Sequence, residues 1–294
     1  MVVKILILGG SGMLGHRLWI NLQKKFEVWV TVRGDRNPFP QAPEFPQEYI
    51  RYRVDGLTFD EVTRALASIQ PDLVINCIGL IKPIGHIARD PLLSISLNAL
   101  LPHRISLICR TAKIRMIHIS TDCVFSGRKG NYVETDQSDA EDLYGRTKFL
   151  GELHYPHTVT LRTSIIGQEL KTHLGLMEWF LSQSGTINGY QKAIYSGFTT
   201  DELSRIIADY IIPNPTLSGL YHVSSAPISK YDLLHLGRAY FKKEIEILPD
   251  QNFVCDRSLD SMRFRQAAGY EPPTWPKMIE EMAAGFSFYK QFRG

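Results

Sequence analysis

Tyr144 and Lys148 are the residues whose types and spacing most directly suggest chemistry. They lie four positions apart in the segment YGRTK, so on a helix both side chains would point into the same space. An ammonium beside a phenol favours the phenolate and lowers the tyrosine pKa, which brings it closer to what a general acid needs near neutral pH. The pair therefore predicts a proton donor for a reacting oxygen, although Y-x-x-x-K on a helix also occurs by chance.

Hydroxyl and carboxyl groups come earlier in the chain, where the apolar run IRMIHIS ends in Ser120, Thr121 and Asp122. Open parallel sheets bind their ligands at the carboxyl ends of the strands. A hydroxyl at this position could hydrogen-bond the same carbonyl oxygen as Tyr144. These residues therefore predict a second contact to the reacting group, and Ser120 is expected to contact the cofactor.

Three glycines at a spacing of three residues follow the first apolar run of the chain and precede a helical pattern. Such a turn needs positive φ, backbone N–H groups that no Cβ obstructs, and a close approach of helix to strand. It delivers phosphates to the positive end of the helix. An ordinary strand-to-helix turn is the alternative, but the place at the first βαβ unit favours a dinucleotide site. We expect it to be formed by Gly9, Ser11, Gly12, Met13, Leu14 and Gly15.

Further cofactor contacts are expected at the ends of the next strands. Arg33 stands where an NAD site usually offers an acid, and its guanidinium matches a 2′-phosphate in charge and shape. A solvated arginine near Asp35 is the alternative. Asp55 is placed to accept from an adenine amino group, or simply forms a turn. In the segment NCIG, Cys77 and Gly79 would let backbone pass close to the cofactor.

Apolar runs alternate with amphipathic stretches through the first half of the chain, which predicts a parallel sheet wrapped by helices. Nearly continuous apolar strands such as KILIL suit a sheet that is buried on both faces. We therefore expect an α/β fold, a Rossmann-type doubly wound parallel sheet with a smaller, discontinuous C-terminal substrate lobe. The expected division is 1–166 for the dinucleotide-binding domain and 167–294 for most of the lobe, with a strand near 219–224 that rejoins the sheet. Strands are expected at 2–8, 28–32, 49–54, 73–77, 114–119 and 158–162, and helices at 13–25, 58–69, 91–112, 141–154, 173–182, 199–211, 229–241 and 276–289.

Composition narrows the class of protein. The 294 residues carry a formal net charge of +3 with the basic residues scattered, which disfavours a nucleic-acid surface. The four cysteines form no C-x-x-C pair and the histidines no ligand spacing, so no metal site is expected. The first apolar run is too short for a membrane span and is followed by a glycine turn. We expect a cytoplasmic protein that binds neither nucleic acid nor membrane.

The order of GGSGMLG, NCIG, STDCVFSG, YGRTK and LRTSIIG resembles the extended short-chain dehydrogenase/reductases, and within them the dTDP-4-dehydrorhamnose reductase-like branch. The resemblance covers essentially the whole chain. It implies that Thr121 polarises a sugar ketone, that Tyr144 donates the proton, and that Lys148 binds the nicotinamide ribose and tunes Tyr144. The nicotinamide would give hydride to C4 of a hexose. The resemblance also implies that Asn98 supports the active-site lysine.

The segment Asp122-Cys123 departs from two relatives of this branch. Sugar-nucleotide dehydratases carry Asp-Glu there because elimination of water needs an extra acid and base, and a thiol replaces that glutamate poorly. The 4-dehydrorhamnose reductases proper usually show a tyrosine at the Cys123 position. Simple reduction is therefore favoured over dehydration, while the identity of the sugar stays open.

Substrate contacts are expected beyond this segment. Asp122 and Cys123 would face the substrate, and the resemblance makes Arg162 and Ser164 further candidates, with an ion pair to the loop ETDQSDAED as the alternative for the arginine. YSGFTT at 195–200 and CDRSLD at 255–260 resemble substrate-lobe segments, in which Arg257 could meet a diphosphate. Lys82 could face the sugar, or could be an ordinary surface lysine.

Three functions are compatible with the sequence. The first is NADPH-dependent reduction, with NADH possible, of a nucleotide-linked 4-keto-6-deoxyhexose for deoxysugar or polysaccharide biosynthesis. The second is a sugar-nucleotide epimerase that keeps its cofactor bound. The third is a non-catalytic NADP-binding regulatory subunit, as in the β-subunit of methionine adenosyltransferase, because a fold does not fix a function. A homodimer is possible for each.

Overall fold

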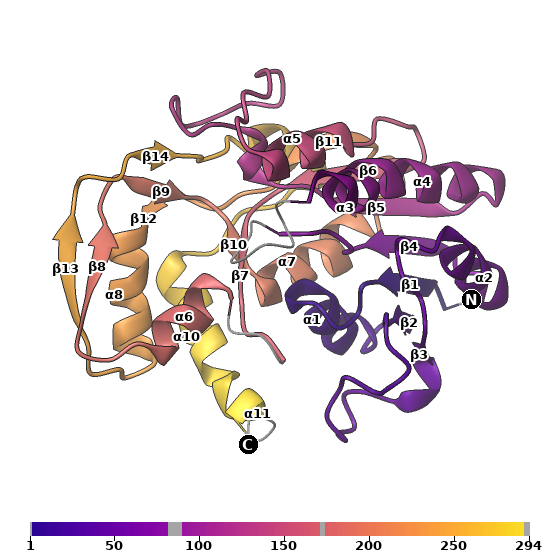
Figure 1. Cartoon of the computed structure of the whole chain (residues 1–294), viewed down its shortest axis with the longest axis horizontal. Coiled ribbons are helices and arrows are strands. Elements are labelled where there is room, and N and C mark those ends of the chain that lie inside the picture. Colours follow the sequence, from indigo (N-terminus) through magenta and orange to yellow (C-terminus); the bar gives the residue numbers. More distant parts are fainter. Residues whose placement is uncertain (1, 82–89, 171–173, 291–294) are drawn as a thin grey trace.

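A seven-stranded sheet forms the centre of the protein, and all of its neighbouring strands run parallel. The computed structural model describes residues 2–81, 90–170 and 174–290. Figure 1 shows the sheet and the helices around it. In order across the sheet, the strands are β11 (Gly219–His222), β6 (Thr158–Arg162), β5 (Arg115–Ile119), β4 (Leu73–Asn76), β1 (Lys4–Leu8), β2 (Glu27–Thr31) and β3 (Ile50–Arg51).

Both faces of the sheet are buried. Successive side chains of a strand point to opposite faces, and each set packs into its own apolar cluster. In β1, Ile5 and Ile7 belong to one apolar cluster and Leu6 and Leu8 to another. The first cluster includes side chains of α1 (Met13–Leu22) and α7 (Thr200–Ile206), and the second includes side chains of α2 (Phe59–Ile69) and α4 (Leu101–Thr111). The expected doubly wound parallel sheet is therefore confirmed.

One long helical segment, Pro91–Thr111, comprises α3 (Pro91–Ser94), the wider π-helical turn η3 (Ile95–Leu100) and α4. It is the only helix within the described ranges that is long and apolar enough to cross a membrane, and half of its apolar window is buried inside the protein. Core helices share this composition. Ile105 of α4 is fully buried against the sheet, so we assign the helix to the core.

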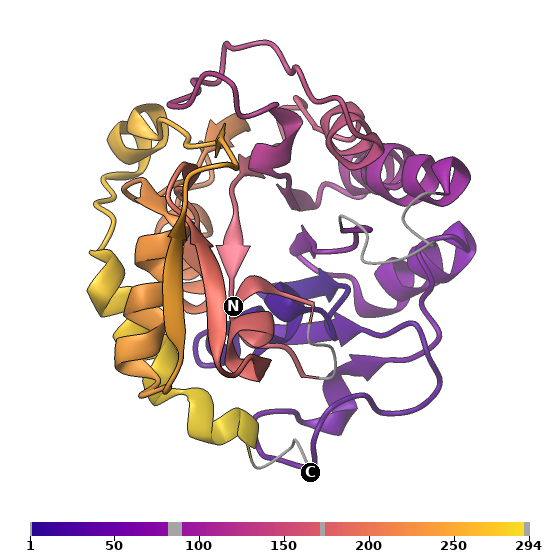
Figure 2. The ribbon, with the colours of Figure 1, turned by 60° about the vertical axis from the view of Figure 1, so that its left-hand side comes forward.

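Most elements after β7 (Ile165–Ile166) gather beside the sheet, and Figure 2 shows them on one side of the molecule. The pairs β10·β7 and β13·β8 are parallel, while β9 lies between antiparallel β12 and parallel β14. η5 (Ile207–Ile211) continues α7 against the sheet. The other elements are α6 (Leu176–Ser182), β8 (Thr186–Tyr190), β9 (Ala193–Tyr195), β10 (Phe198–Thr199), β12 (Ile228–Ser229), α8 (Lys230–Tyr240), β13 (Glu246–Asp250), β14 (Cys255–Asp256), α9 (Met262–Ala268), α10 (Trp275–Ala284) and α11 (Phe286–Lys290).

Two sequence-based boundaries gain a physical explanation. The strand expected near 219–224 is present as β11, which pairs with β6 at the sheet edge, while the division of the chain at residue 166 stays a prediction. The helix expected at 141–154 is shorter, because α5 spans Leu143–Leu150. A Cβ at Gly151 would lie 1.9 Å from the carbonyl oxygen of Asn98. The backbone at Gly151 packs directly against the backbone of η3, and α5 ends one residue before this contact.

The last described helix, α11, is joined to the first helix of the chain. His16 of α1 is fully buried, and its Nδ1 lies 2.8 Å from the carbonyl oxygen of Gly12. Its Nε2 lies 2.7 Å from the hydroxyl of Tyr289. Because a carbonyl can only accept, Nδ1 carries the proton and Nε2 accepts from Tyr289. Two segments that are 273 residues apart thus share a buried hydrogen-bond chain.

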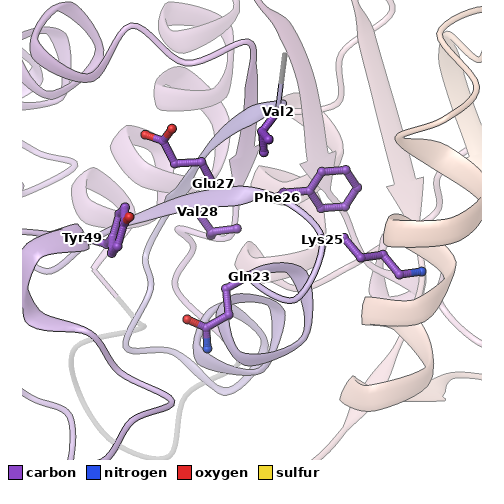
Figure 3. A pocket seen from close by; sticks show the side chains of 7 residues that line it. All are labelled: Val2, Gln23, Lys25, Phe26, Glu27, Val28 and Tyr49. Carbon is purple, nitrogen blue, oxygen red and sulfur yellow. The ribbon is translucent and has the colours of Figure 1, made fainter.

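A surface pocket drawn in Figure 3 lies at the opposite end of the sheet from the expected ligands. It is lined by residues that precede or begin β1 and β2, including Val2, Glu27 and Val28. These are the amino ends of the strands, whereas open α/β sheets bind ligands beyond the carboxyl ends. The active site is therefore expected at the other edge.

Candidate active site

The turn after β1 is shaped by glycines at the positions that the spacing predicts. Gly9 has a φ of +84°, in the region that side chains disfavour. A Cβ at Gly15 would lie 2.2 Å from the carbonyl oxygen of Gly9, so α1 approaches the turn closely only because Gly15 has none. The hydroxyl and the carbonyl of Thr31 accept from Gly9 N at 3.1 Å and Gly10 N at 2.9 Å, which anchors the turn to β2.

The start of α1 is suited to an anion. Its N-cap residue is Gly12, which makes no side-chain cap, so no side chain of that residue occupies the first N–H groups of the helix. Ser11 and Gly12 are exposed, and Met13 is partly exposed. An open helix N-terminus beside a glycine turn fits the pyrophosphate of a dinucleotide. Leu14 is buried beneath the turn.

The residues expected to discriminate NADP from NAD and to contact adenine lie in the loops that follow β2 and β3. Arg33 is exposed two residues after β2, where it can reach a ligand. Asp35 contacts Arg53 at 3.8 Å. Asp55 accepts from Leu57 N at 2.9 Å, which is the turn-forming role that the sequence left open for it. This bond occupies one carboxylate oxygen and leaves a contact to adenine as a prediction.

Tyr144 and Lys148 lie on α5, which is held close to the loop after β5. The helix begins after Asp142, whose carboxylate accepts from Gly145 N at 2.7 Å. A Cβ at Gly145 would lie 2.2 Å from the carbonyl oxygen of Cys123. This close packing places Tyr144 beside Thr121, which is near enough to affect the tyrosine pKa.

Burial dominates the electrostatics of the pair. It lowers the pKa of Lys148 to about 8, although the charge of Glu152 opposes the change. The Lys148 ammonium donates to the carbonyl oxygen of Ile119 at 2.7 Å. The expectation that Lys148 lowers the pKa of Tyr144 is wrong for this structure. Burial raises that pKa, with Cys123 adding to the effect and Thr121 opposing it, so Tyr144 is a firmly protonated phenol.

The loop after β4 reaches Lys148 from the other side. A Cβ at Gly79 would lie 3.2 Å from Oδ1 of Asn98 and 3.8 Å from Nζ of Lys148. The Asn98 amide holds this loop, because it accepts from Leu80 N at 2.8 Å and donates to Leu80 O at 3.1 Å. Asn98 thus acts on the loop that lies against the lysine. Burial raises the pKa of the Cys77 thiol to about 12, so this group stays neutral.

Thr121 and Asp122 are buried side by side at the carboxyl end of β5, at 7% exposure each. The Thr121 hydroxyl donates to Asp122 Oδ1 at 3.0 Å and accepts from Cys123 N at 3.1 Å. Burial raises the pKa of Asp122, opposed by the charge of Arg257 and by the Thr121 and Ser164 side chains. Thr121, Ser164 and Arg257 therefore all lie near Asp122, and Thr121 and Asp122 also lie near Tyr144.

The side chains of Arg162 and Ser120, which were expected to contact ligands, are both bonded to Glu152. Arg162 is 2% exposed, and its guanidinium forms a two-pronged ion pair with Glu152 at 2.7 Å and 2.7 Å. It also contacts Nε2 of His222 at 3.2 Å. The Ser120 hydroxyl donates to the same Glu152 at 2.8 Å. The glutamate, and not the expected acid-rich loop, satisfies Arg162, so the position of Arg162 argues against a substrate contact.

Arg257 follows β14 and closes the substrate side of the site. It donates to the carbonyl oxygens of Phe125 at 2.7 Å and Ser126 at 3.3 Å. Burial opposes its charge, but Cys123, Cys255 and Asp122 favour it and raise its pKa. It also lines a pocket of about 570 Å³ with Asp142. A diphosphate contact for Arg257 stays a prediction, and Lys82 lies outside the described residues.

Several residues that shape the site were not identified from the sequence as site residues. Thr31 anchors the glycine turn, Asp142 starts α5, and Glu152 neutralises Arg162. Asp142 could have been found, because an aspartate three residues before Gly145 matches an N-cap pattern. Tyr195 was named in the sequence analysis only as the first residue of the segment YSGFTT, without a role of its own. No local signal marks Glu152, since its partner Arg162 follows ten positions later on another element.

Comparisons with known proteins agree with this geometry. The model of the family described as the RmlD substrate binding domain matches residues 3–287. The β-subunit of methionine adenosyltransferase 2 from Danio rerio is 25% identical over 78% of this chain and 71% of its own length. A dTDP-4-dehydrorhamnose reductase from Mycolicibacterium smegmatis is 26% identical over 79% of this chain and 67% of its own length. A crystal structure of dTDP-4-dehydrorhamnose reductase from Bacillus anthracis in complex with NADP has a TM-score of 0.78 at 20% identity, and covers 96% of this chain and 99% of that one.

Proposed function

The chain belongs to the RmlD substrate binding domain family, and from this premise we propose that it reduces the C4 ketone of a nucleotide-linked 4-keto-6-deoxyhexose with NADPH. The product would serve deoxysugar and polysaccharide biosynthesis. The observation that carries the proposal is the convergence of Tyr144, Lys148 and Thr121 at the carboxyl ends of β4 to β6, next to the glycine turn. Relatives that are named as reductases of a 4-keto sugar support the choice of substrate.

Bound NADPH supplies the hydride, and the chain positions the ketone and provides the proton. Tyr144 suits the proton donor, because its raised pKa keeps it protonated until charge develops on the ketone oxygen. Lys148 would contact the nicotinamide ribose and favour the tyrosinate that remains. Its lowered pKa of about 8 keeps most of the ammonium charged at neutral pH.

Thr121 can polarise the ketone only after a local change. Its hydroxyl donates to Asp122, and one hydroxyl has one proton to donate. A substrate oxygen between Thr121 and Tyr144 would have to draw that proton away from the carboxylate. Asp122 would then be available to a hydroxyl of the sugar, so the two residues would divide the contacts to the substrate.

NADPH is preferred over NADH because Arg33 is exposed at the end of β2, where a 2′-phosphate would lie. The Bacillus anthracis reductase, which was crystallised with NADP, points the same way, while NADH stays possible. The four cysteines, all within the described ranges, form no disulfide, which suits the cytoplasm. A homodimer is compatible with the exposed apolar residues of helix 91–111, including Leu92 and Ile95.

A regulatory subunit is the second candidate function. The relative from Danio rerio is named as a β-subunit of methionine adenosyltransferase 2 and matches most of this chain. A regulatory protein of this fold would bind NADP without reducing a sugar. The retention of Thr121, Tyr144 and Lys148 in one place favours catalysis, since a purely regulatory chain needs no proton donor.

The test is a panel of enzymatically generated nucleotide-linked 4-keto-6-deoxy sugars, each mixed with the protein and NADPH or NADH. Absorbance of the reduced cofactor reports turnover. We expect oxidation that depends on one sugar and falls by about 10³-fold in Tyr144→Phe, in the range for loss of a general acid, while NADPH affinity is retained. Tight NADPH binding without turnover on any sugar would favour the regulatory subunit. Turnover without added NADPH would favour an epimerase.

A further inference from the structure

A buried hydroxyl close to the site has no obvious function in the fold. Tyr195, the last residue of β9, is 7% exposed. By hydrogen-bond geometry its hydroxyl has no partner in the described ranges, although the Ser164 side chain lies near enough to affect its pKa. Buried polar groups without a partner are rare in native proteins, because the lost hydration is not replaced. A ligand that supplies the missing partner is one explanation for such a group.

The position of the ring supports this explanation. Trp275 packs against it with ring centroids 5.5 Å apart, which fixes the ring while leaving the hydroxyl at its far end. A Cβ at Gly197 would lie 2.3 Å from the Tyr195 hydroxyl and 2.1 Å from the carbonyl oxygen of Ser164. The missing side chain at Gly197 therefore lets the hydroxyl reach the loop after β6. That loop lies at the carboxyl edge of the sheet, where Thr121 also lies.

The groups around the hydroxyl are complementary in hydrogen bonding. Asp122 is near enough to add to the effect of burial, and both raise the pKa of Tyr195, while the Ser164 side chain opposes them. Tyr195 is thus a phenol that can donate. Asp122 can only accept when it is ionised, and Ser164 can do either. A sugar hydroxyl would accept from Tyr195 and donate to Asp122, which satisfies both.

We propose that Tyr195 and Asp122 form a subsite for the sugar hydroxyl on the carbon next to the reacting ketone, and that Tyr195 is a specificity-determining residue. This inference rests on the proposed reduction. Asp122 follows Thr121 directly, and their side chains are 3.0 Å apart. A substrate whose ketone oxygen lies at Thr121 and Tyr144 therefore brings its neighbouring hydroxyl to Asp122 and Tyr195.

The experiment compares two substrates in two proteins. The sugar that is reduced in the panel and its counterpart lacking the C3 hydroxyl are assayed with wild type and with Tyr195→Phe, which keeps the ring. We expect the variant to lose about tenfold in kcat/KM on the hydroxylated sugar, as for one hydrogen bond to a buried group, and nothing on the deoxy sugar. Calorimetric binding of the two reduced products gives the same comparison without turnover.

Two controls separate this role from a structural one. Removal of an unpaired buried hydroxyl should leave the Tm of Tyr195→Phe unchanged or raised. Tyr190→Phe, at an exposed tyrosine of β8 that packs on Phe253, should behave as wild type on both sugars. A lowered Tm with unchanged sugar preference would overturn the subsite, as would equal losses on both sugars. If wild type reduces no sugar, the proposed function falls and the subsite falls with it.

Discussion

The glycine turn, which we propose binds the cofactor phosphates, and the sheet edge with Thr121 and Tyr144, which we propose as the catalytic edge, lie at the same end of the sheet. They are built from different groups. The turn consists of backbone, and its shape depends on the absence of a Cβ atom at Gly9 and Gly15. The catalytic edge consists of side chains that touch one another, such as Thr121 with Asp122. Beneath that edge, Glu152 joins Arg162 and Ser120 in a network that is almost fully buried.

This difference teaches which changes each region can tolerate. A backbone site is damaged by adding atoms, because a new Cβ must displace the carbonyl or strand that it meets. A side-chain network is damaged by removing atoms, because the partner of a deleted charge stays buried without compensation. Additions to the turn should therefore affect cofactor affinity, whereas deletions beneath the edge should affect stability first.

Arg162→Met should produce the largest effect. It leaves the Glu152 carboxylate buried without its ion-pair partner, which costs about 3 to 5 kcal/mol of unfolding free energy. Chemical denaturation monitored by circular dichroism measures this change. The double variant Glu152→Leu/Arg162→Met is the control, since removal of both charges should recover much of the loss. Equal instability of the single and the double variant would show that packing, and not charge, holds the network.

Gly15→Ala should come next, and should act on the cofactor. The added methyl group meets the Gly9 carbonyl oxygen, and overpacking of this kind costs about 1 to 3 kcal/mol. We expect that cost to appear as weaker NADPH binding in a fluorescence titration. Gly285→Ala is the matched control, because its nearest neighbour would be 3.6 Å away. Unchanged NADPH affinity in Gly15→Ala would mean that the backbone of the turn shifts to accept the methyl group without loss of the binding site.

Arg33→Ala tests the one side chain that we expect to select NADPH over NADH beside the glycine turn. Loss of an exposed contact to the 2′-phosphate should weaken NADPH binding by about tenfold, or about 1.4 kcal/mol, and should leave NADH binding unchanged. Competition between the two cofactors measures the ratio directly. A similar loss for both cofactors would place Arg33 elsewhere in the site.

The pH dependence of stability should show the smallest effect and belongs to the catalytic edge. The folded-state pKa of Lys148 is about 8, below its ordinary value of 10.5. Between these values the unfolded chain binds more protons, so stability rises with pH. From pH 8.5 to 9.5 the cofactor-free wild type should gain roughly 1 kcal/mol relative to Lys148→Met. Parallel melting curves at the two pH values test this, and an identical pH dependence would exclude the burial of the ammonium charge.

The sequence predicted the shape of the glycine turn and the shared helix of Tyr144 and Lys148, because both are encoded in short spacings. Their roles in cofactor binding and catalysis stay predictions. Glycines three apart and Y-x-x-x-K define backbone shape and helix face locally, and the resemblance based on them is confirmed by the family match. Arg162 was interpreted wrongly for the opposite reason. Its partner Glu152 lies in the loop after α5, so only the folded chain reveals the pair. The pKa of Tyr144 was predicted in the wrong direction because spacing reports a neighbouring charge but not burial.

The hydrogen bond between His16 and Tyr289 has a consequence for the order of events during synthesis. His16 leaves the ribosome early, but its partner is made 273 residues later. Until then the imidazole that bonds Gly12 of the cofactor turn cannot acquire its buried neighbour. The nascent chain can therefore assemble the first strands of its sheet while it is translated, yet the turn gains its final support only after α11 has been released and docks.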